Sequence, residues 1–227
     1  MYLRRIMKPK QMDFEYSFWT MLQLLISPKT AYRHTAYHKQ TKNYWARDDP
    51  AFILVMSALI VLASVAYCVA FSDTFGHAVL TVLSVVTIDF VLLGCATATT
   101  GWLVSNNFLR KKSTHSHQVE QHVEWMYAFD VHCNAYFPLF VTLYALQLLL
   151  SPVLLWDSFL STTLSIALYA GSLGYYHYMT FLGYSTLPFL EHTEVFLWPI
   201  GAIFLCVPFA VLANFNPARF TLSFYFH

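Results

Sequence analysis

Long apolar stretches separated by short polar segments make up most of the chain from residue 51 onward. A helix that crosses a bilayer needs about 20 mostly apolar residues, because about 30 Å of hydrocarbon offers the backbone no other hydrogen-bond partner. Five stretches meet this requirement, and each carries at most one charged side chain. The pattern predicts an all-α polytopic membrane protein with five transmembrane helices, at residues 51–72, 78–103, 131–156, 158–182 and 195–213.

Polar and turn-forming residues mark the expected ends of these helices. Asp48-Asp49-Pro50 supplies a helix cap and a proline at the first position of the first span. Asp157 is the capping candidate for the fourth span. Residues 105–124 and 183–194 are polar or rich in turn formers, which predicts connecting loops on a membrane surface.

The N-terminal region predicts one further helix, at residues 12–26, which Ser27-Pro28 ends. Its apolar residues recur at the spacing of one helix face: Phe14, Phe18, Met21, Leu22 and Leu25. The helix is too short to span, and basic residues flank it on both sides, which is typical of an amphipathic helix on an anionic bilayer surface. The alternative is that the same face packs against the helical bundle. We therefore divide the chain into an N-terminal region, 1–50, and a five-span domain, 51–227.

The N-terminal region also holds the candidate interfacial or partner-binding residues. They are the basic, aromatic and acidic side chains that surround the amphipathic helix and precede the first span. These residues are Arg4, Arg5, Lys8, Lys10, Phe14, Phe18, Trp19, Arg33, Lys39, Trp45, Arg47, Asp48 and Asp49.

Charge placement predicts the orientation of the chain. Only 11% of the residues are charged and 57% are apolar, which excludes an ordinary water-soluble domain. Nine of the 13 Lys and Arg residues precede Ala51, three more form residues 110–112, and Arg219 is the last. With five spans, the positive-inside rule places the N-terminus in the cytosol and the C-terminus in the lumen.

Asp89 is the one charged residue near the middle of a predicted span. An ionisable group at that depth needs a partner, and the available intramembrane polar side chains are Asp130, His132, Asn134 and His177. One isolated carboxylate favours a structural role that ties helices together. The alternative is a small proton- or ion-coupled transporter that uses Asp89.

The sequence contains no recognisable catalytic motif. Phosphate loops, HExxH, GxSxG and paired Cys/His arrangements are absent, so we expect no enzymatic activity and no cofactor. His115, His117 and His122 could supply metal ligands, but their spacing does not define a site, and we expect no bound metal. The basic and aromatic N-terminal segment could suit RNA, but anionic lipid is the favoured partner because no RNA-binding fold signature accompanies it.

Several motifs together resemble the uncoordinated-fifty (Unc-fifty) family almost from end to end. They are Gln11 to Glu15, Lys39 to Lys42, Trp45 to Phe52, Val123 to Trp125 with Tyr127 to His132, and Phe181 to Ser185 with Leu187 to Leu190. The resemblance implies a small multi-span protein of the Golgi, or also of the endoplasmic reticulum. It also implies a role in vesicular trafficking, with receptor cargo delivered to the cell surface and an Arf guanine-nucleotide exchange factor recruited.

Overall fold

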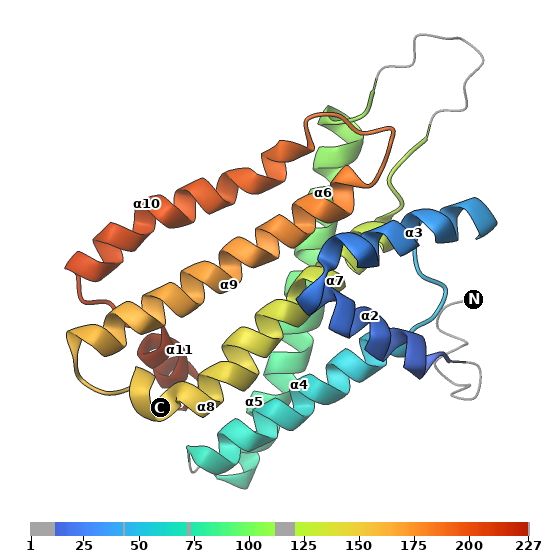
Figure 1. The fold of residues 1–227 in the computed structure, drawn as a ribbon. Helices are drawn as coiled ribbons and strands as arrows, with labels where there is room; N and C mark the ends of the chain where they lie inside the picture. Colours follow the sequence, from blue (N-terminus) through green and yellow to red (C-terminus); the bar gives the residue numbers. More distant parts are fainter. Residues whose placement is uncertain (1–11, 43, 72–73, 112–120, 227) are drawn as a thin grey trace.

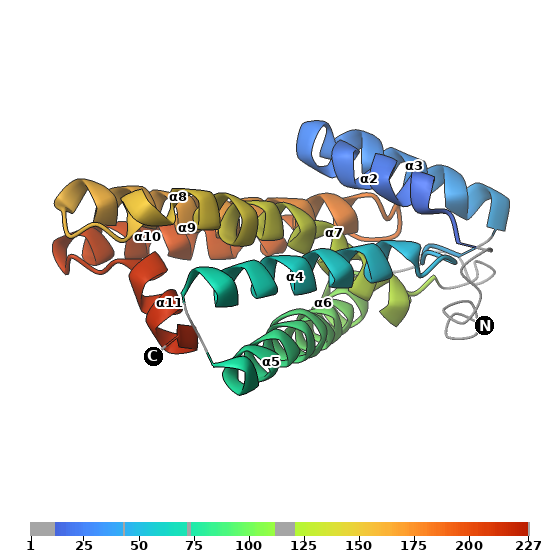
Figure 2. The same cartoon turned by 90° about the horizontal axis from the view of Figure 1, so that it is seen from below.

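The long helices lie roughly side by side in one bundle, and two shorter helices of the N-terminal region cross one end of it (Figures 1 and 2). The computed structural model describes residues 12–42, 44–71, 74–111 and 121–226, and the side chains of 36–42 lie outside this description. Within these ranges the chain forms no strand beyond one isolated bridge between Arg110 and Leu190. The elements are α2(Phe14–Ile26), α3(Pro28–Lys42), α4(Ala51–Ala70), α5(Phe75–Ser84), η2(Val85–Leu92), α6(Leu93–Phe108), α7(Trp125–Phe140), η3(Val141–Leu146), α8(Gln147–Leu154), α9(Phe159–Ser185), η4(Thr193–Leu197), α10(Trp198–Leu212) and α11(Pro217–Phe226).

Four helical segments of the described chain are long and apolar enough to cross a membrane. They are Ala51–Ala70, Phe75–Phe108, Trp125–Leu154 and Thr193–Leu212. Each one overlaps a span that the hydrophobic pattern predicts. The prediction of an all-helical membrane protein is therefore confirmed, with four candidate spans in place of the predicted five.

The helix missing from that set is α9, which covers the predicted span at 158–182. It contains 27 residues and no charged side chain, so its length suffices. Its serine, threonine, glycine and tyrosine residues make it less apolar than the other four. Nevertheless α9 lies between α7–α8 and α10 and runs antiparallel to both (Figure 1).

Some predicted helix ends are wrong by a few residues. Helix α6 continues to Phe108, so residues 105–108 belong to the helix and not to the loop. Ser158, not Asp157, caps α9, because the Ser158 side chain accepts a hydrogen bond from the amide of Ser161 at 3.1 Å. Pro50 precedes α4 as its N-cap residue and is not the first helical residue.

The second and third candidate spans each contain a stretch of π-helix. The second span runs through α5, η2 and α6, and the third runs through α7, η3 and α8. A π-helical turn widens the backbone locally and often marks a functional site, because it displaces side chains from regular α-helical positions.

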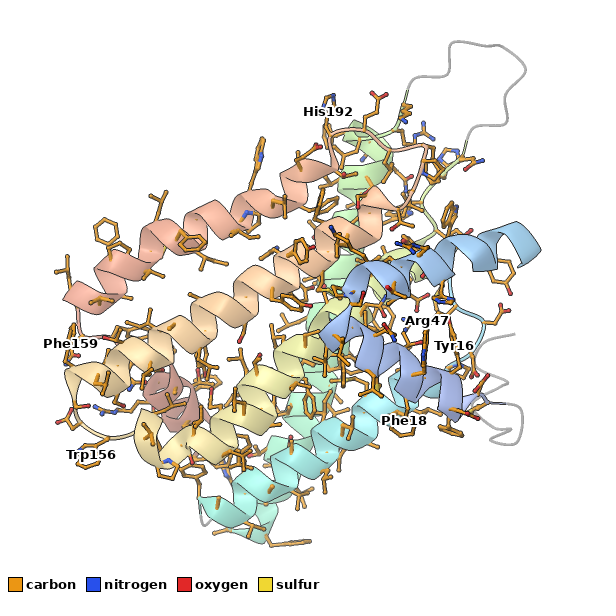
Figure 3. All side chains as sticks on the ribbon, viewed as in Figure 1. Tyr16, Phe18, Arg47, Trp156, Phe159 and His192 are labelled. Carbon is orange, nitrogen blue, oxygen red and sulfur yellow. The ribbon has the colours of Figure 1, made fainter. Side chains whose placement is uncertain are left out.

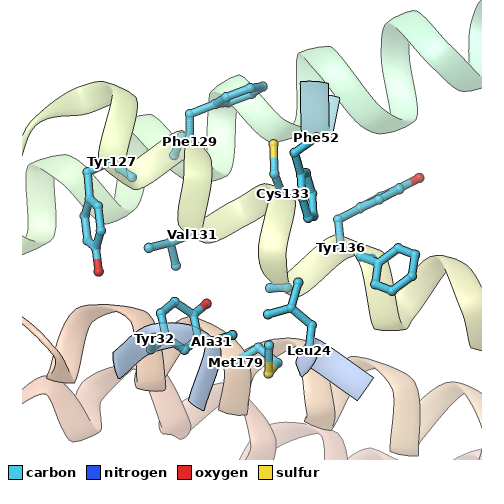
Figure 4. Close-up of a cluster of buried hydrophobic side chains, with 14 of the residues drawn as sticks. Leu24, Ala31, Tyr32, Phe52, Tyr127, Phe129, Val131, Cys133, Tyr136 and Met179 are labelled. Atoms are coloured by element: carbon cyan, nitrogen blue, oxygen red, sulfur yellow. The ribbon is translucent and has the colours of Figure 1, made fainter. Parts of the chain in front are cut away.

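The core lies where α7 packs between α4, α6 and α9, close to the N-terminal helices (Figure 4). Nearly every residue of α7 is buried, including Tyr127, Val131 and Cys133. Leu24 of α2 and Tyr32 of α3 belong to the same cluster, so the N-terminal helices share the core of the membrane domain. Burial raises the pKa of the Tyr32 hydroxyl above its ordinary value, because the phenolate would lose its hydration.

Gly183 allows α9 to approach α7 closely, and its replacement gives a first prediction. A Cβ atom at this position would lie 2.7 Å from Val131 Cγ2, and the Gly183 carbonyl accepts a hydrogen bond from the Tyr127 hydroxyl at 2.7 Å. We expect Gly183→Ala to lower the free energy of unfolding by about 1–3 kcal/mol, the usual cost of overpacking a core. Thermal unfolding of the purified protein in detergent measures the change.

Gly174→Ala is the matched control on the same helix. Apart from its chain neighbours and the backbone of its own helix, no atom lies within 4 Å of a Cβ atom at residue 174, so alanine should leave stability unchanged or raise it slightly. If the Gly183→Ala protein is as stable as the Gly174→Ala protein, α9 and α7 have room for a methyl group at residue 183, which would contradict the prediction.

Candidate functional site

The segment between the N-terminal helices and α4 is attached to the start of α7 through carboxylates. The amides of Trp45 and Ala46 donate hydrogen bonds to the Glu124 carboxylate at 3.2 and 3.1 Å. The amide of Arg47 donates to Asp130 Oδ2 at 2.6 Å. Three consecutive backbone donors thus bind two acidic side chains of another segment, and charge-assisted hydrogen bonds of this kind are stronger than neutral ones. We call this arrangement the junction.

The Arg47 side chain extends the junction along α7. Its Nη2 donates to the Asn134 side-chain oxygen, and its guanidinium carbon lies 4.2 Å from the centre of the Phe52 ring. Nη1 is buried and makes no hydrogen bond to any described residue. Asp130 and Asn134, one helical turn apart, therefore hold the backbone and the side chain of the same arginine.

Helix α2 is tied to the junction through Asp49. The amide of Asp13, the N-cap residue of α2, donates to Asp49 Oδ2 at 2.5 Å, and the amide of Ala51 donates to Oδ1 at 3.0 Å. A single carboxylate thus binds the starts of both α2 and α4. A recess of about 240 Å³ remains beside this contact, with Tyr16, Arg47 and Asp48 in its wall. Figure 3 labels Tyr16 and Arg47 in this part of the molecule.

The apolar face predicted for α2 is mostly not packed on the bundle. Phe14, Phe18, Leu22 and Leu25 are between 38% and 58% exposed, whereas Met21 is buried. The side of α2 that contacts the bundle consists of Ser17, Thr20, Met21 and Leu24. Figure 3 marks Phe18 on this helix. Four of the five residues of the predicted face are therefore partly exposed, and only Met21 is buried.

The other candidate residues of the N-terminal region have different surroundings. Trp19 is half-buried and packs edge-on against His34, and Trp45 is buried against Tyr127. Arg33 is exposed on α3. Arg4, Arg5, Lys8, Lys10 and the Lys39 side chain lie outside the described residues.

Asp89 has partners that the sequence did not suggest. It lies on η2, and its Oδ2 accepts hydrogen bonds from the hydroxyls of Tyr225 at 2.5 Å and Tyr144 at 3.4 Å. Tyr144 lies on η3 and Tyr225 on α11, so the carboxylate connects the second and third spans to the C-terminal helix. The expected contacts of Asp89 with Asp130, His132, Asn134 or His177 are not among its hydrogen bonds in the described structure.

Those four polar residues divide between two places. Asp130 and Asn134 belong to the junction. His132 is buried, and its Nδ1 lies 3.1 Å from the Thr97 hydroxyl and 2.9 Å from the Tyr176 hydroxyl. His177 is half-buried and lines the same cavity as His132 and Asp89.

The histidine loop shows no metal centre among the residues that can be described. His115 and His117 lie outside them, and the Nδ1 of His122 is 2.5 Å from Arg110 Nη1. No group of three or more His, Cys, Asp or Glu residues in the described ranges could hold a metal ion.

Sequence reasoning missed the two tyrosines at Asp89 and also missed Glu124 as an anchor of the junction. It also missed helix α11, although Asn216-Pro217 is a start signal: the Asn216 side chain accepts a hydrogen bond from the amide of Arg219 at 3.1 Å, and proline follows at the first helical position. Gln147, a polar residue within an apolar run, was a second signal that was not used, and it could have indicated a polar site inside the bundle.

Comparison with known proteins gives one consistent result. A family model described as the UNC-50 family matches residues 2–226. A protein of Dictyostelium discoideum named "Protein unc-50 homolog" is 47% identical over 226 residues, which is 99% of this chain and 86% of that protein. A human protein of the same name is 40% identical over 225 residues, covering 99% of this chain and 85% of its own length. No solved structure matches the chain significantly.

Proposed function

Because the chain belongs to the UNC-50 family, we propose that it is a non-enzymatic membrane protein of the Golgi and early secretory pathway that acts in vesicular trafficking. In this role it supports delivery of receptor cargo to the cell surface and recruits an Arf guanine-nucleotide exchange factor. The observation that carries the proposal is the junction, because it fixes the N-terminal helices to the membrane domain as one docking platform.

Helix α9 is the fifth span in this proposal. Its neighbours α7–α8 and α10 are both candidate spans, and α9 connects the end of one to the start of the other while running antiparallel between them. If both neighbours cross the bilayer in the same direction, α9 must return across it. Its 27 residues extend about 40 Å at 1.5 Å per residue, which exceeds the hydrocarbon thickness.

Five spans place the two termini on opposite sides of the membrane, with the N-terminus cytosolic and the C-terminus lumenal. The basic residues support this orientation, since twelve of the 13 precede the first span or follow the second one in the sequence, and five spans put both segments on the same side. We expect protease added to sealed microsomes to remove an N-terminal tag and to spare a C-terminal tag until detergent is added. Digestion of both tags without detergent would indicate an even number of spans and would exclude α9 as a span.

The exposed apolar face of α2 lies in the headgroup region of an anionic bilayer in this arrangement. Phe14, Phe18 and Leu22 then enter the lipid boundary, while Lys29 and Arg33 on α3 remain exposed. An exchange factor would approach from the polar side, over α3 and the cytosolic loops.

Proximity labelling tests the docking role. A ligase fused to the N-terminus of the full chain should label an Arf exchange factor, and charge reversal of Lys29 and Arg33 to glutamate should reduce that label. The same ligase at the C-terminus is the control and should label lumenal proteins only. Equal labelling of the exchange factor from both ends, or labelling unaffected by charge reversal, would contradict the proposal.

A small transporter is the second candidate function. The observation in its favour is that the Asp89 carboxylate borders a cavity within the helical bundle.

A further inference from the structure

A cavity of about 420 Å³ lies inside the helical bundle, away from the junction. It is lined by residues of α4, the second and third candidate spans, α9 and α11. Along the third span its wall runs from His132 to Gln147, which corresponds to about 22 Å of helix at 1.5 Å per residue. Binding sites for small organic molecules typically have volumes of roughly 300–1,000 Å³. The space is therefore long and narrow, and large enough for one ligand.

Four buried polar atoms on the wall make no hydrogen bond to any residue that the structure describes. They are Ser64 Oγ, Tyr67 Oη, Gln147 Oε1 and His132 Nε2, from residues that are 3%, 6%, 2% and 4% exposed. A buried polar group without a partner is costly, and most such groups in native proteins find one. The first three atoms lie near the end of the cavity that α11 closes, and His132 Nε2 lies toward the opposite end. Ser64, Tyr67 and Gln147 therefore provide one polar site at the α11 end of a mainly apolar space.

Charge limits the chemistry of the ligand. The described lining includes no lysine or arginine that could bind a phosphate or another anionic headgroup. Its one carboxylate, Asp89, already accepts hydrogen bonds from Tyr144 and Tyr225. The polar site therefore suits an uncharged group that both donates and accepts hydrogen bonds, such as a hydroxyl.

The walls of the cavity indicate how a ligand could enter and be retained. Both π-helical segments contribute to it, through Asp89 on η2 and Tyr144 on η3. Leu93 and Leu173 line the cavity and are 52% and 39% exposed, so the cavity opens toward the surface that faces the lipid. Phe226 of α11 stacks on Tyr67 with ring centres 6.2 Å apart and closes the polar end.

From this geometry we infer that the cavity binds one uncharged membrane lipid that carries a hydroxyl headgroup. The apolar body lies along the third span, and the hydroxyl donates a hydrogen bond to Gln147 Oε1 and accepts one from the Tyr67 hydroxyl. A sterol and a diacylglycerol share this chemistry. The proposal is independent of the trafficking role, because it uses none of the residues of the junction.

Photolabelling of the purified full-length protein in nanodiscs tests the inference. The probes are a diazirine sterol and a diazirine diacylglycerol, each competed with unlabelled sterol, diacylglycerol or phosphatidylserine. Leu143→Phe places a larger side chain in the cavity, and Leu149→Phe is the matched control, because Leu149 is 77% exposed on the same span. Gln147→Leu removes the hydroxyl acceptor without adding bulk.

We expect at least one probe to label peptides of α4, α8 or α11 and to be displaced by its own unlabelled lipid but not by phosphatidylserine. Labelling by one probe alone identifies the source of the hydroxyl. Leu143→Phe should abolish the label, Leu149→Phe should retain it, and Gln147→Leu should weaken binding about tenfold, since tenfold corresponds to the 1.4 kcal/mol scale of a lost hydrogen bond. If Leu143→Phe does not fold, the affinity of the Gln147→Leu protein for the probe decides whether the lipid binds in this cavity.

Three results would overturn the inference. The first is uniform labelling of all lipid-facing helices. The second is equal displacement by phosphatidylserine. The third is a folded Gln147→Leu protein that binds as tightly as the unaltered one.

Discussion

Replacing Asp130 with leucine is expected to release the N-terminal helices from the membrane domain and to reduce the amount of folded protein strongly. Asp130 is 4% exposed, and its carboxylate accepts the hydrogen bond of the Arg47 amide. Leucine would leave that buried donor unpaired beside the arginine side chain, at a cost of about 1–3 kcal/mol or more. Hydrogen exchange of the peptide that contains residues 44–50 should become much faster.

Two variants show whether this effect is specific to the junction. Asp130→Asn keeps an oxygen acceptor and should give intermediate exchange. Asp157→Leu removes a carboxylate whose ion pair with Arg219 is exposed at the other end of the bundle, with 90% of the Asp157 side chain accessible. Such pairs contribute little, so stability should change by less than about 1 kcal/mol. Unchanged exchange in a folded Asp130→Leu protein would show that the carboxylate does not hold the junction.

The same junction would also connect the docking platform to the bundle. Arg47 contacts α7 through Asp130 and Asn134, and α7 packs against both α6 and α9. A loosened junction should therefore reduce labelling of an exchange factor even where the protein remains in the membrane. Loss of that labelling in Asp130→Leu but not in Asp157→Leu would link this contact to the proposed function.

Helix positions could be predicted from the sequence wherever an apolar run met the length of a span. The four candidate spans were found in this way, because a bilayer demands both length and low polarity. Helix α9 is long enough to span the bilayer, but serine, threonine and tyrosine residues alternate with its apolar ones. Several of their hydroxyls donate hydrogen bonds to carbonyls of the same helix. Its place in the bundle therefore depends on its neighbours, which a sequence window does not include.

The orientation of α2 could be predicted only in part. Periodicity located the helix and its apolar face, but it could not show what covers that face. The bundle side instead uses Ser17 and Thr20, whose hydroxyls donate to backbone carbonyls four residues earlier. Small polar residues that satisfy their own hydrogen bonds can be buried, and a hydrophobic pattern does not detect them.

The junction and the contacts of Asp89 with Tyr144 and Tyr225 show a further limit of sequence reasoning. Trp45, Arg47, Asp48 and Asp49 were identified as candidates, but Glu124 was not linked to them, because it follows them by about 80 positions. Tyr225 is 136 positions from Asp89. Contacts at such separation depend on how the helices pack. A tyrosine in an apolar sequence also indicates an aromatic core residue at least as strongly as a hydrogen-bond donor.

Asp89→Asn is expected to preserve stability, Golgi residence and receptor delivery, whereas Asp89→Leu is expected to reduce protein abundance. Asparagine keeps an oxygen that can accept hydrogen bonds from Tyr144 and Tyr225. Leucine removes the oxygen that accepts both hydrogen bonds and leaves two tyrosine hydroxyls to find other partners, at a cost of about 1–3 kcal/mol. Thermal unfolding, cellular abundance and a receptor-delivery assay measure the difference.

Tyr225→Phe separates the structural contact from the carboxylate. It removes the 2.5 Å hydrogen bond and leaves Asp89 in place, so a structural role predicts a loss of stability smaller than that of Asp89→Leu. A transporter predicts a different pattern, because an ion pathway needs an ionisable side chain at this depth. An abundant, correctly located Asp89→Asn protein without function, together with proton or ion flux in proteoliposomes that the same change abolishes, would replace the trafficking proposal with transport. Full function of Asp89→Asn with no such flux in the unaltered protein would leave Asp89 as the group that ties η2 to α11.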